Sequence, residues 1–195
     1  MTDIGTGTST TTSATDDVIA AVRRDHAEIK QLFARVEASK GDEQRDAFRL
    51  LVTKLAVHET AEEELVHPLL RKTPGGEAVL DPLLQQEDQA KKELAELEKI
   101  EPGSAAFEAK FQTIRNAVLQ HAEQEEQQEH PRLEQDVDAE RRRKLAALFR
   151  AAEASAPTHP HPNAPESATG NMVLGPFVAI ADRVRDAIRD AREKA

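Results

Sequence analysis

The sequence lacks cysteine, tryptophan and tyrosine, and phenylalanine alone accounts for its 3% of aromatic residues. Without cysteine the chain has no disulfide, no thiolate metal site and no cysteine nucleophile, so nitrogen and oxygen atoms must hold any metal. Apolar runs are also short, far below the ~20 residues that a bilayer-spanning helix needs. The opening segment MTDIGTGTSTTTSATDD has neither the charged start nor the apolar middle of a signal peptide, so we expect a cytoplasmic protein with a disordered tail over residues 1–15.

Acidic residues outnumber basic ones, 36 Asp and Glu against 26 Lys and Arg, so the formal net charge is −10. A general nucleic-acid binder or an anionic-membrane binder needs a basic face, so we expect neither kind of partner. Charged residues nevertheless make up 32% of the chain, and long stretches alternate Ala, Leu, Glu, Lys and Arg. This composition predicts an all-α protein, which we expect to be a monomer or a weak homodimer.

Apolar residues recur at three- and four-residue steps in four segments separated by breaks. This is the period of amphipathic helices, of which the first begins after Asp16 or Asp17 and the fourth after Ser104. Breaks at 73–76 and 102–103 end the second and third helices. Four helices of roughly 20 to 25 residues with short connections predict an antiparallel up-down four-helix bundle. The apolar stripes are Val18, Val22, Ile29, Leu32, Phe33 and Val36; Phe48, Leu51, Leu55, Leu65 and Leu69; Leu84, Leu94 and Leu97; and Phe107, Phe111, Ile114 and Val118.

The C-terminal third is predicted to extend this bundle. A fifth helical stretch covers about 137–154, so the predicted domain spans residues 16–154. Residues 155–171 are rich in Pro, Ser and Asn and are expected to form an irregular linker. Residues 172–195 form a predicted amphipathic helix whose apolar face needs a partner, either the bundle or another subunit. That face carries Phe177, Ile180, Val184, Ala187 and Ile188.

Three of the four bundle stripes contain a polar residue where the helical period requires an apolar one. His26 interrupts the first stripe, His58 and Glu62 interrupt the second, and His121 and Glu125 interrupt the fourth. Two H-x-x-x-E motifs therefore face the bundle interior, together with a single histidine. Buried carboxylates and imidazoles need partners, and a metal provides them best. Oxygen and imidazole ligands suit iron or manganese pairs, although the ligand type alone does not exclude zinc.

The two motifs belong to a repeated segment. HETAEEELVHP, residues 58–68, matches HAEQEEQQEHP, residues 121–131, in the spacing of its His, Glu and His-Pro positions. A Glu-rich chain produces H-x-x-x-E easily on a solvated face, so one copy alone would be weak support. Two copies in phase with the apolar stripes predict a site with approximate two-fold symmetry. His67 and His130 lie nine residues after a predicted ligand, half a turn away on a regular helix, and are interpreted as marking helix kinks or ends.

These residues resemble the hemerythrin, or HHE cation-binding, domain over about residues 17–134. The resemblance is carried by RRDHAEIKQLFARVEA, VHETAEEELVHPLL, LAELEKIEP and LQHAEQEE. It implies a hemerythrin-like four-helix bundle with two iron ions bridged by oxo or hydroxo groups. This chain departs from the family on the third helix, where the usual His is replaced by Glu87, with Asp88, Gln89 or an open position as the alternatives. The ligand set implied is His26, His58, Glu62, Glu87, His121 and Glu125.

The resemblance implies a function with oxygen species, either oxygen or hydrogen peroxide. Because hemerythrins that carry oxygen have more histidines in the site, we expect peroxide breakdown of a catalase-like or peroxidase-like kind rather than reversible oxygen carriage. An iron-sensing or oxygen-sensing module that acts through a partner is the alternative. A third reading, an interaction bundle without metal, predicts that the purified protein carries no metal.

Overall fold

A computed structural model of the protein describes residues 16–155 and 175–194, and the side chains of the second range from Ala179 onward. In these ranges every regular element is helical, which confirms the all-α prediction. The predicted tail over 1–15 and nearly all of the predicted linker lie outside the described residues. The elements are α1 (Val18–Ala38), α2 (Asp42–Leu65), α3 (His67–Leu70), α4 (Gly76–Leu97), α5 (Ala105–Gln124), the π-helical turn η1 (Glu125–Glu129), α6 (His130–Asp136), α7 (Ala139–Ala154) and α8 (Gly175–Glu193).

Local side-chain chemistry explains where the long helices begin. The Asp17 carboxylate accepts a hydrogen bond from the backbone N–H of Ala20 at 3.1 Å, and the Ser104 hydroxyl accepts one from Phe107 at 3.2 Å. Each cap satisfies one of the N–H groups that the first helical turn leaves unpaired. Gly75 precedes α4 with a φ of 70°, a left-handed conformation that glycine adopts without strain.

The second predicted helix is shorter than the apolar pattern suggested, because α2 ends at Leu65 and α3 starts at His67. Pro68 explains the break, since it lacks an N–H and its ring clashes with the carbonyl four residues earlier. Pro131 is the equivalent residue of the repeated segment, where the chain passes through the wider π-helical turn η1 before α6. The first His-Pro junction therefore marks a helix end, whereas at the second the helix widens into a π-helical turn and continues.

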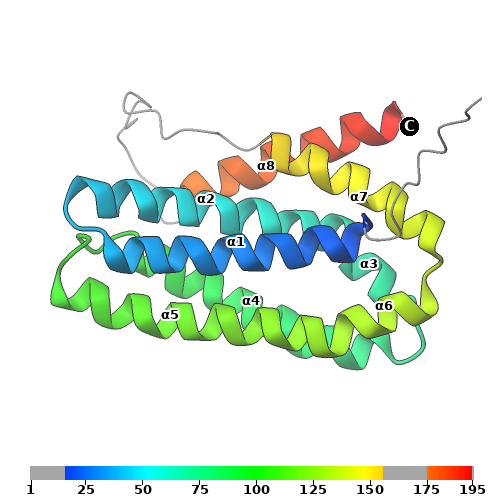
Figure 1. Ribbon diagram of the computed structural model, residues 1–195, viewed down its shortest axis with the longest axis horizontal. Helices are drawn as coiled ribbons and strands as arrows, with labels where there is room; N and C mark the ends of the chain where they lie inside the picture. Colours follow the sequence, from blue (N-terminus) through cyan, green and yellow to red (C-terminus); the bar gives the residue numbers. More distant parts are fainter. Residues whose placement is uncertain (1–15, 156–174, 195) are drawn as a thin grey trace, which may run out of the picture.

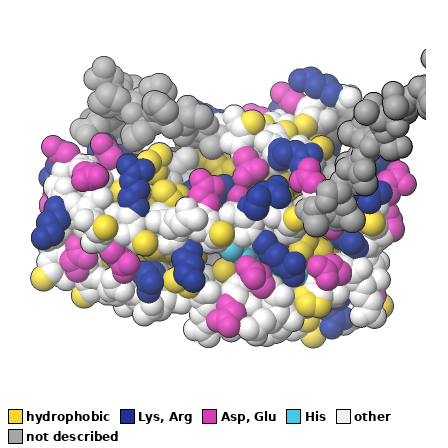
Figure 2. All heavy atoms as spheres, viewed as in Figure 1, with side chains coloured by type: hydrophobic (Ala, Val, Ile, Leu, Met, Phe, Trp, Pro, Cys, Tyr) yellow, Lys and Arg dark blue, Asp and Glu magenta, His cyan; other side chains and the backbone are white. Residues whose placement is uncertain are grey.

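The long helices run side by side in pairs. Helices α1 and α2 pack against each other and lie between the pair α4–α5 on one side and the pair α7–α8 on the other (Figure 1). The short helices α3 and α6 contact each other at one end of the molecule. On the face shown in Figure 2, basic and acidic side chains are interspersed. Within the described ranges no helix combines the length and apolarity needed to cross a membrane.

Two apolar clusters fill the interior, and the polar interruptions lie between them. The phenylalanine core packs four rings with centroids 5.1 to 6.4 Å apart and includes Ile29, Phe33, Val36, Phe48, Leu51, Leu55, Leu94, Leu97, Phe107, Phe111, Ile114 and Val118. The C-terminal core joins the other ends of these helices to α7 and α8 and includes Val18, Val22, Ala61, Leu65, Leu70, Leu80, Leu133, Phe149, Ile180, Val184 and Ile188.

Helix α8 packs on α2 and α7, so the bundle itself covers the apolar face that the sequence left without a partner. Val184 and Ile188 are completely buried there, and Arg192 donates a hydrogen bond to the Glu64 carbonyl at 2.9 Å. Arg185 lies 3.6 Å from Glu63 and 3.5 Å from Glu64. The side chain of Phe177, which was assigned to the same face, lies outside the described residues.

Candidate metal centre

The six predicted ligands come from five elements and are all buried. Helix α1 contributes one, α2 two, and α4, α5 and η1 one each. None exposes more than 6% of its surface, although all six are polar or charged. They lie where the two apolar clusters leave a gap, and their order along the helices places them at one level. These residues are His26, His58, Glu62, Glu87, His121 and Glu125.

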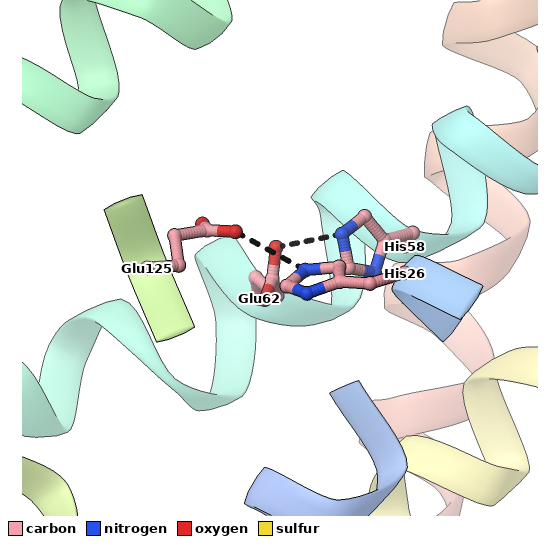
Figure 3. A group of neighbouring side chains, drawn as sticks. All are labelled: His26, His58, Glu62 and Glu125. Carbon is pink, nitrogen blue, oxygen red and sulfur yellow. Dashed lines mark ion pairs between the residues drawn. The ribbon is translucent and has the colours of Figure 1, made fainter. Parts of the chain in front are cut away.

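Four of the six form one compact group. His26, His58, Glu62 and Glu125 each offer a ligand atom within 4.8 Å of the others (Figure 3). Nε2 of His26 lies 3.2 Å from Glu125 Oε2, and Nε2 of His58 lies 3.2 Å from Glu62 Oε2. The imidazole nitrogens and carboxylate oxygens thus point toward one another across three elements.

The other two residues, Glu87 and His121, form a second group with Glu59. Oε1 of Glu125 lies 3.1 Å from Nε2 of His121, while its Oε2 faces His26. A single carboxylate therefore joins the two groups, as a bridging ligand between two cations would. Of the three third-helix candidates, only Glu87 faces this centre, because Asp88 and Gln89 are exposed.

Acceptors hold the outward ring nitrogens of His26 and His121. Nδ1 of His26 lies 2.8 Å from Glu126 Oε1, and Nδ1 of His121 lies 3.2 Å from Gln86 Oε1. Nδ1 of His58 faces the buried Asp25 carboxylate at 3.6 Å. An acceptor at Nδ1 favours a proton on that nitrogen and leaves Nε2 to offer its lone pair inward, the arrangement typical of metal-bound histidines.

Sequence reasoning missed four further residues that face the centre or border it. Glu59, His67, Glu129 and His130 expose 7%, 4%, 0% and 0% of their surface. The histidines were expected half a turn away from the ligand face, but the break before His67 and the π-helical turn before His130 reset the helical phase. One signal could have revealed Glu129, since it follows Glu125 by four residues and continues the polar stripe.

The centre holds an unusual number of polar atoms without a hydrogen bond. Both carboxylate oxygens of Glu62, Glu87, Glu125 and Glu129 have no hydrogen-bond partner among the described residues, and neither ring nitrogen of His67 has one. Leaving such groups unpaired in a low-dielectric interior costs several kcal/mol each. Cations shared between the carboxylates and imidazoles would satisfy them, so the residues fit a metal centre.

The protonation states of the metal-free centre reflect the same crowding. Burial and the neighbouring charges of Glu125 and Glu129 raise the pKa of Glu62 well above its usual value. Burial and the Glu59 charge raise the pKa of Glu87 to about 9. Burial alone would also raise the pKa of Glu125, but close contact with His121 and His26 holds it well below the usual value. Metal binding would displace the protons that these groups carry.

A cavity of about 400 Å³ opens between α4 and α5 and reaches the second group. Glu59, Glu87 and His121 form its inner end. The rest of its wall includes Pro82, Gln85, Gln86, Gln89, Ala90, Glu93, Ile114, Ala117, Val118 and Gln120. A small molecule can therefore approach the second group from this side.

Comparisons with known proteins point to a cation-binding family. The family model described as the hemerythrin HHE cation binding domain matches residues 17–133. An uncharacterized hemerythrin-like protein of Schizosaccharomyces pombe is 24% identical over 169 residues, which cover 85% of this chain and 83% of the relative. A DNA nickase of Nostoc sp. is 25% identical over 132 residues, which cover 67% of this chain but only 37% of the nickase. No solved structure gives a significant match.

Proposed function

The chain belongs to the hemerythrin HHE cation-binding family, and we propose that helices α1, α2, α4 and α5 form an antiparallel up-down bundle that holds two iron ions. The ions occupy the two groups that Glu125 joins. His26, His58 and Glu62 hold the first, and Glu87 and His121 hold the second. Oxygen and nitrogen donors of this kind suit iron in helical bundles.

One observation carries this proposal: the inward Nε2 atoms converge on unpaired carboxylates while acceptors hold the Nδ1 atoms of His26 and His121. A structural cluster of His–Glu pairs would show hydrogen bonds between the inward atoms. Here those atoms lie 3.1 to 3.8 Å apart. Within the described ranges, the Nε2 atoms of His26 and His121 and the carboxylate oxygens of Glu62, Glu87 and Glu125 have no hydrogen-bond partner. The geometry leaves space between donors rather than bonding them to one another.

We propose that the centre breaks down hydrogen peroxide rather than carrying oxygen reversibly. When bound, an iron pair supplies the electrons for reactions with oxygen species. The chain contributes three carboxylates to the ligand set, and anionic donors favour the more oxidised metal. The cavity between α4 and α5 admits a small molecule to the second group, whereas α7 and α8 cover the side of α1 and α2.

Metal analysis and peroxide turnover together test this function. We expect close to two irons per purified chain and oxygen evolution from added peroxide, both reduced in Glu87→Ala. Glu87→His should raise the reduction potential, because it removes one negative charge from the centre. Protein that stays free of metal after purification from iron-supplemented cells, with a chelator-independent thermal midpoint, would contradict the metal centre.

Iron or oxygen sensing through a partner is the second candidate, and the contacts of α8 favour it. Glu63 and Glu64, which Arg185 contacts, directly follow Glu62 on α2. Metal occupancy at Glu62 can thus influence how firmly α8 docks. Two irons per chain without peroxide turnover, combined with slower hydrogen exchange of α8 in the iron-loaded protein, would favour sensing. The nickase name is not carried over, because the chain spans 37% of that relative.

A further inference from the structure

A third group of donors lies beside the two already described. His67, Glu125 and Glu129 offer ligand atoms within 4.8 Å of one another. All three are buried, and both possible ligand atoms of His67 and of Glu129 have no hydrogen-bond partner in the described part of the chain. Two unpartnered side chains that are more than nine-tenths buried thus point into a set of carboxylates.

This group is continuous with the second metal position. Oε1 of Glu87 lies 3.5 Å from Nε2 of His67 and 3.8 Å from Nε2 of His121. Glu125 belongs to the third group and also contacts His121 at 3.1 Å. One cation between these atoms would meet donors from α3, α4, α5 and η1 together.

We propose that His67 and Glu129 are ligands of the second metal, and that His67 supplies the imidazole that α4 lacks. The second metal is then held by His67, Glu87, His121, Glu125 and Glu129. A small molecule would approach such a metal from the cavity, which Glu87 and His121 line. The inference rests on the proposed metal centre, but it concerns residues outside the ligand set that the sequence predicted.

A buried ion pair is the competing explanation for His67, and the contacts disfavour it. The distance of 3.5 Å between His67 and Glu87 exceeds that of a charge-assisted hydrogen bond. Such a pair would also leave Glu129, completely buried with two unpartnered oxygens, unexplained.

The repeat supplies a matched control. His130 occupies in the second copy the place of His67 in the first, and it is equally buried. Its ring stacks on that of His26, with centroids 6.0 Å apart, and it belongs to none of the donor groups in the described part of the chain. Removing either imidazole takes away a similar side chain, but only His67 lies within reach of a metal.

Anaerobic titration with Fe²⁺ tests the inference. Wild type and His130→Gln should bind two ions with similar affinities, whereas His67→Gln and Glu129→Gln should bind the second ion at least ~10-fold more weakly. Wild-type affinities in both His67→Gln and Glu129→Gln would overturn this inference and leave the proposed function standing. A wild type that binds no Fe²⁺ would overturn both.

X-ray absorption of the iron-loaded wild type gives a readout that does not depend on how the variants fold. Four imidazoles shared by two irons are expected, compared with three if only the sequence-predicted histidines bind. Circular dichroism at 222 nm verifies that each variant is folded. A count of three imidazoles would overturn the role of His67.

Discussion

The two copies of the repeated segment have the same spacing but different surroundings. In the first copy, residues 58–68, α8 covers the helix and His67 faces the Glu87 carboxylate. In the second copy, residues 121–131, the helix borders the open cavity and His130 faces another imidazole, that of His26. Identical motifs therefore acquire different chemistry from the helices that pack against them.

This difference shows that the neighbouring helices, rather than the motif, determine which carboxylate lies between two histidines. Glu62 pairs with His58, the histidine of its own motif. Glu125 lies between His121, the histidine of its own motif, and His26 of α1. In the metal-free protein their pKa values shift in opposite directions, upward for Glu62 and downward for Glu125. The approximate two-fold symmetry predicted by the spacing is broken at the central carboxylates.

Removing each of these two carboxylates in turn should lower the iron content of the protein by unequal amounts. We expect Glu125→Ala to lose both irons, because it takes one ligand from each position. Glu62→Ala should keep the iron beside His121. The iron content per chain after gel filtration measures both effects, and Glu64→Ala, a partly exposed glutamate on the same helix, serves as the control. A Glu125→Ala protein that retains one iron would show that the carboxylate does not bridge.

Deleting residues 172–195 should affect the first copy much more than the second. Burying Ile180, Val184 and Ile188 contributes about 1.5 to 3 kcal/mol per side chain at most, so the free energy of unfolding should fall by several kcal/mol. The iron beside His58 should then become the first that a chelator removes. Denaturant unfolding and chelation kinetics measure these changes.

The matched control for this deletion is Arg189→Ala, which removes an exposed side chain of α8 that forms an ion pair with Asp186. It should change stability by less than ~0.5 kcal/mol. Equal stability of the deleted and full-length chains would mean that α8 does not stabilise the bundle.

Raising the pH should destabilise the metal-free protein. The folded-state pKa values are about 9 for Glu87, about 8 for Glu129 and about 9 for His121, where contact with Glu125 outweighs the opposing effect of burial. Each exceeds the ordinary value, so its stabilising contribution is present below that value and is lost as the pH rises through the folded pKa. Stability should therefore fall between pH 6.5 and 9.

We expect the thermal midpoint of the metal-free protein to drop by several degrees over this range, since ~1 kcal/mol corresponds to about 2–4 °C for a chain of this size. The iron-loaded protein should not show the drop, because metal-bound groups are already deprotonated. His67 and His130, with pKa values lowered to about 4 by burial, oppose the trend only below pH 6.5. A midpoint that stays level or rises from pH 6.5 to 9 would contradict the assignment.

The smallest difference between the two copies is expected in the iron affinity of variants at the equivalent residues Glu63 and Glu126. Glu126→Gln weakens the acceptor for Nδ1 of His26 and should lower iron affinity by up to ~10-fold. Glu63→Gln should leave the affinity within about two-fold, because Glu63 contacts Lys91 and Arg185 instead of a ring. Competition with a coloured chelator measures the iron affinity of each variant. Equal effects would mean that both act only through net charge.

Much of the fold follows from local sequence signals. The helix starts at Asp17 and Ser104 were predictable because their side chains satisfy nearby N–H groups. The docking of α8 on α2 was not, because an amphipathic face indicates the need for a partner and does not identify it. That choice depends on non-local contacts such as those between Arg185 and Glu63.

The interrupted stripes identified five buried residues for the same local reason, since a His or Glu in phase with apolar residues must point inward. Glu87 came instead from the resemblance to the hemerythrin family. These ligand roles remain predictions. His67 and His130 were missed because a wheel of 3.6 residues per turn assumes one continuous helix. Pro68 and the π-helical turn before His130 break that assumption.

Because α8 follows the donors in the sequence, it is also synthesised after them. Every donor lies between residues 26 and 130, whereas α7 and α8 follow, and Arg192 reaches back over 128 residues to Glu64. Because chains fold from their N-terminus as they leave the ribosome, the donors are complete while the α1–α2 side is still uncovered. We therefore expect the nascent bundle to take up iron through the face that α7 and α8 later close, leaving the cavity between α4 and α5 for molecules that come and go.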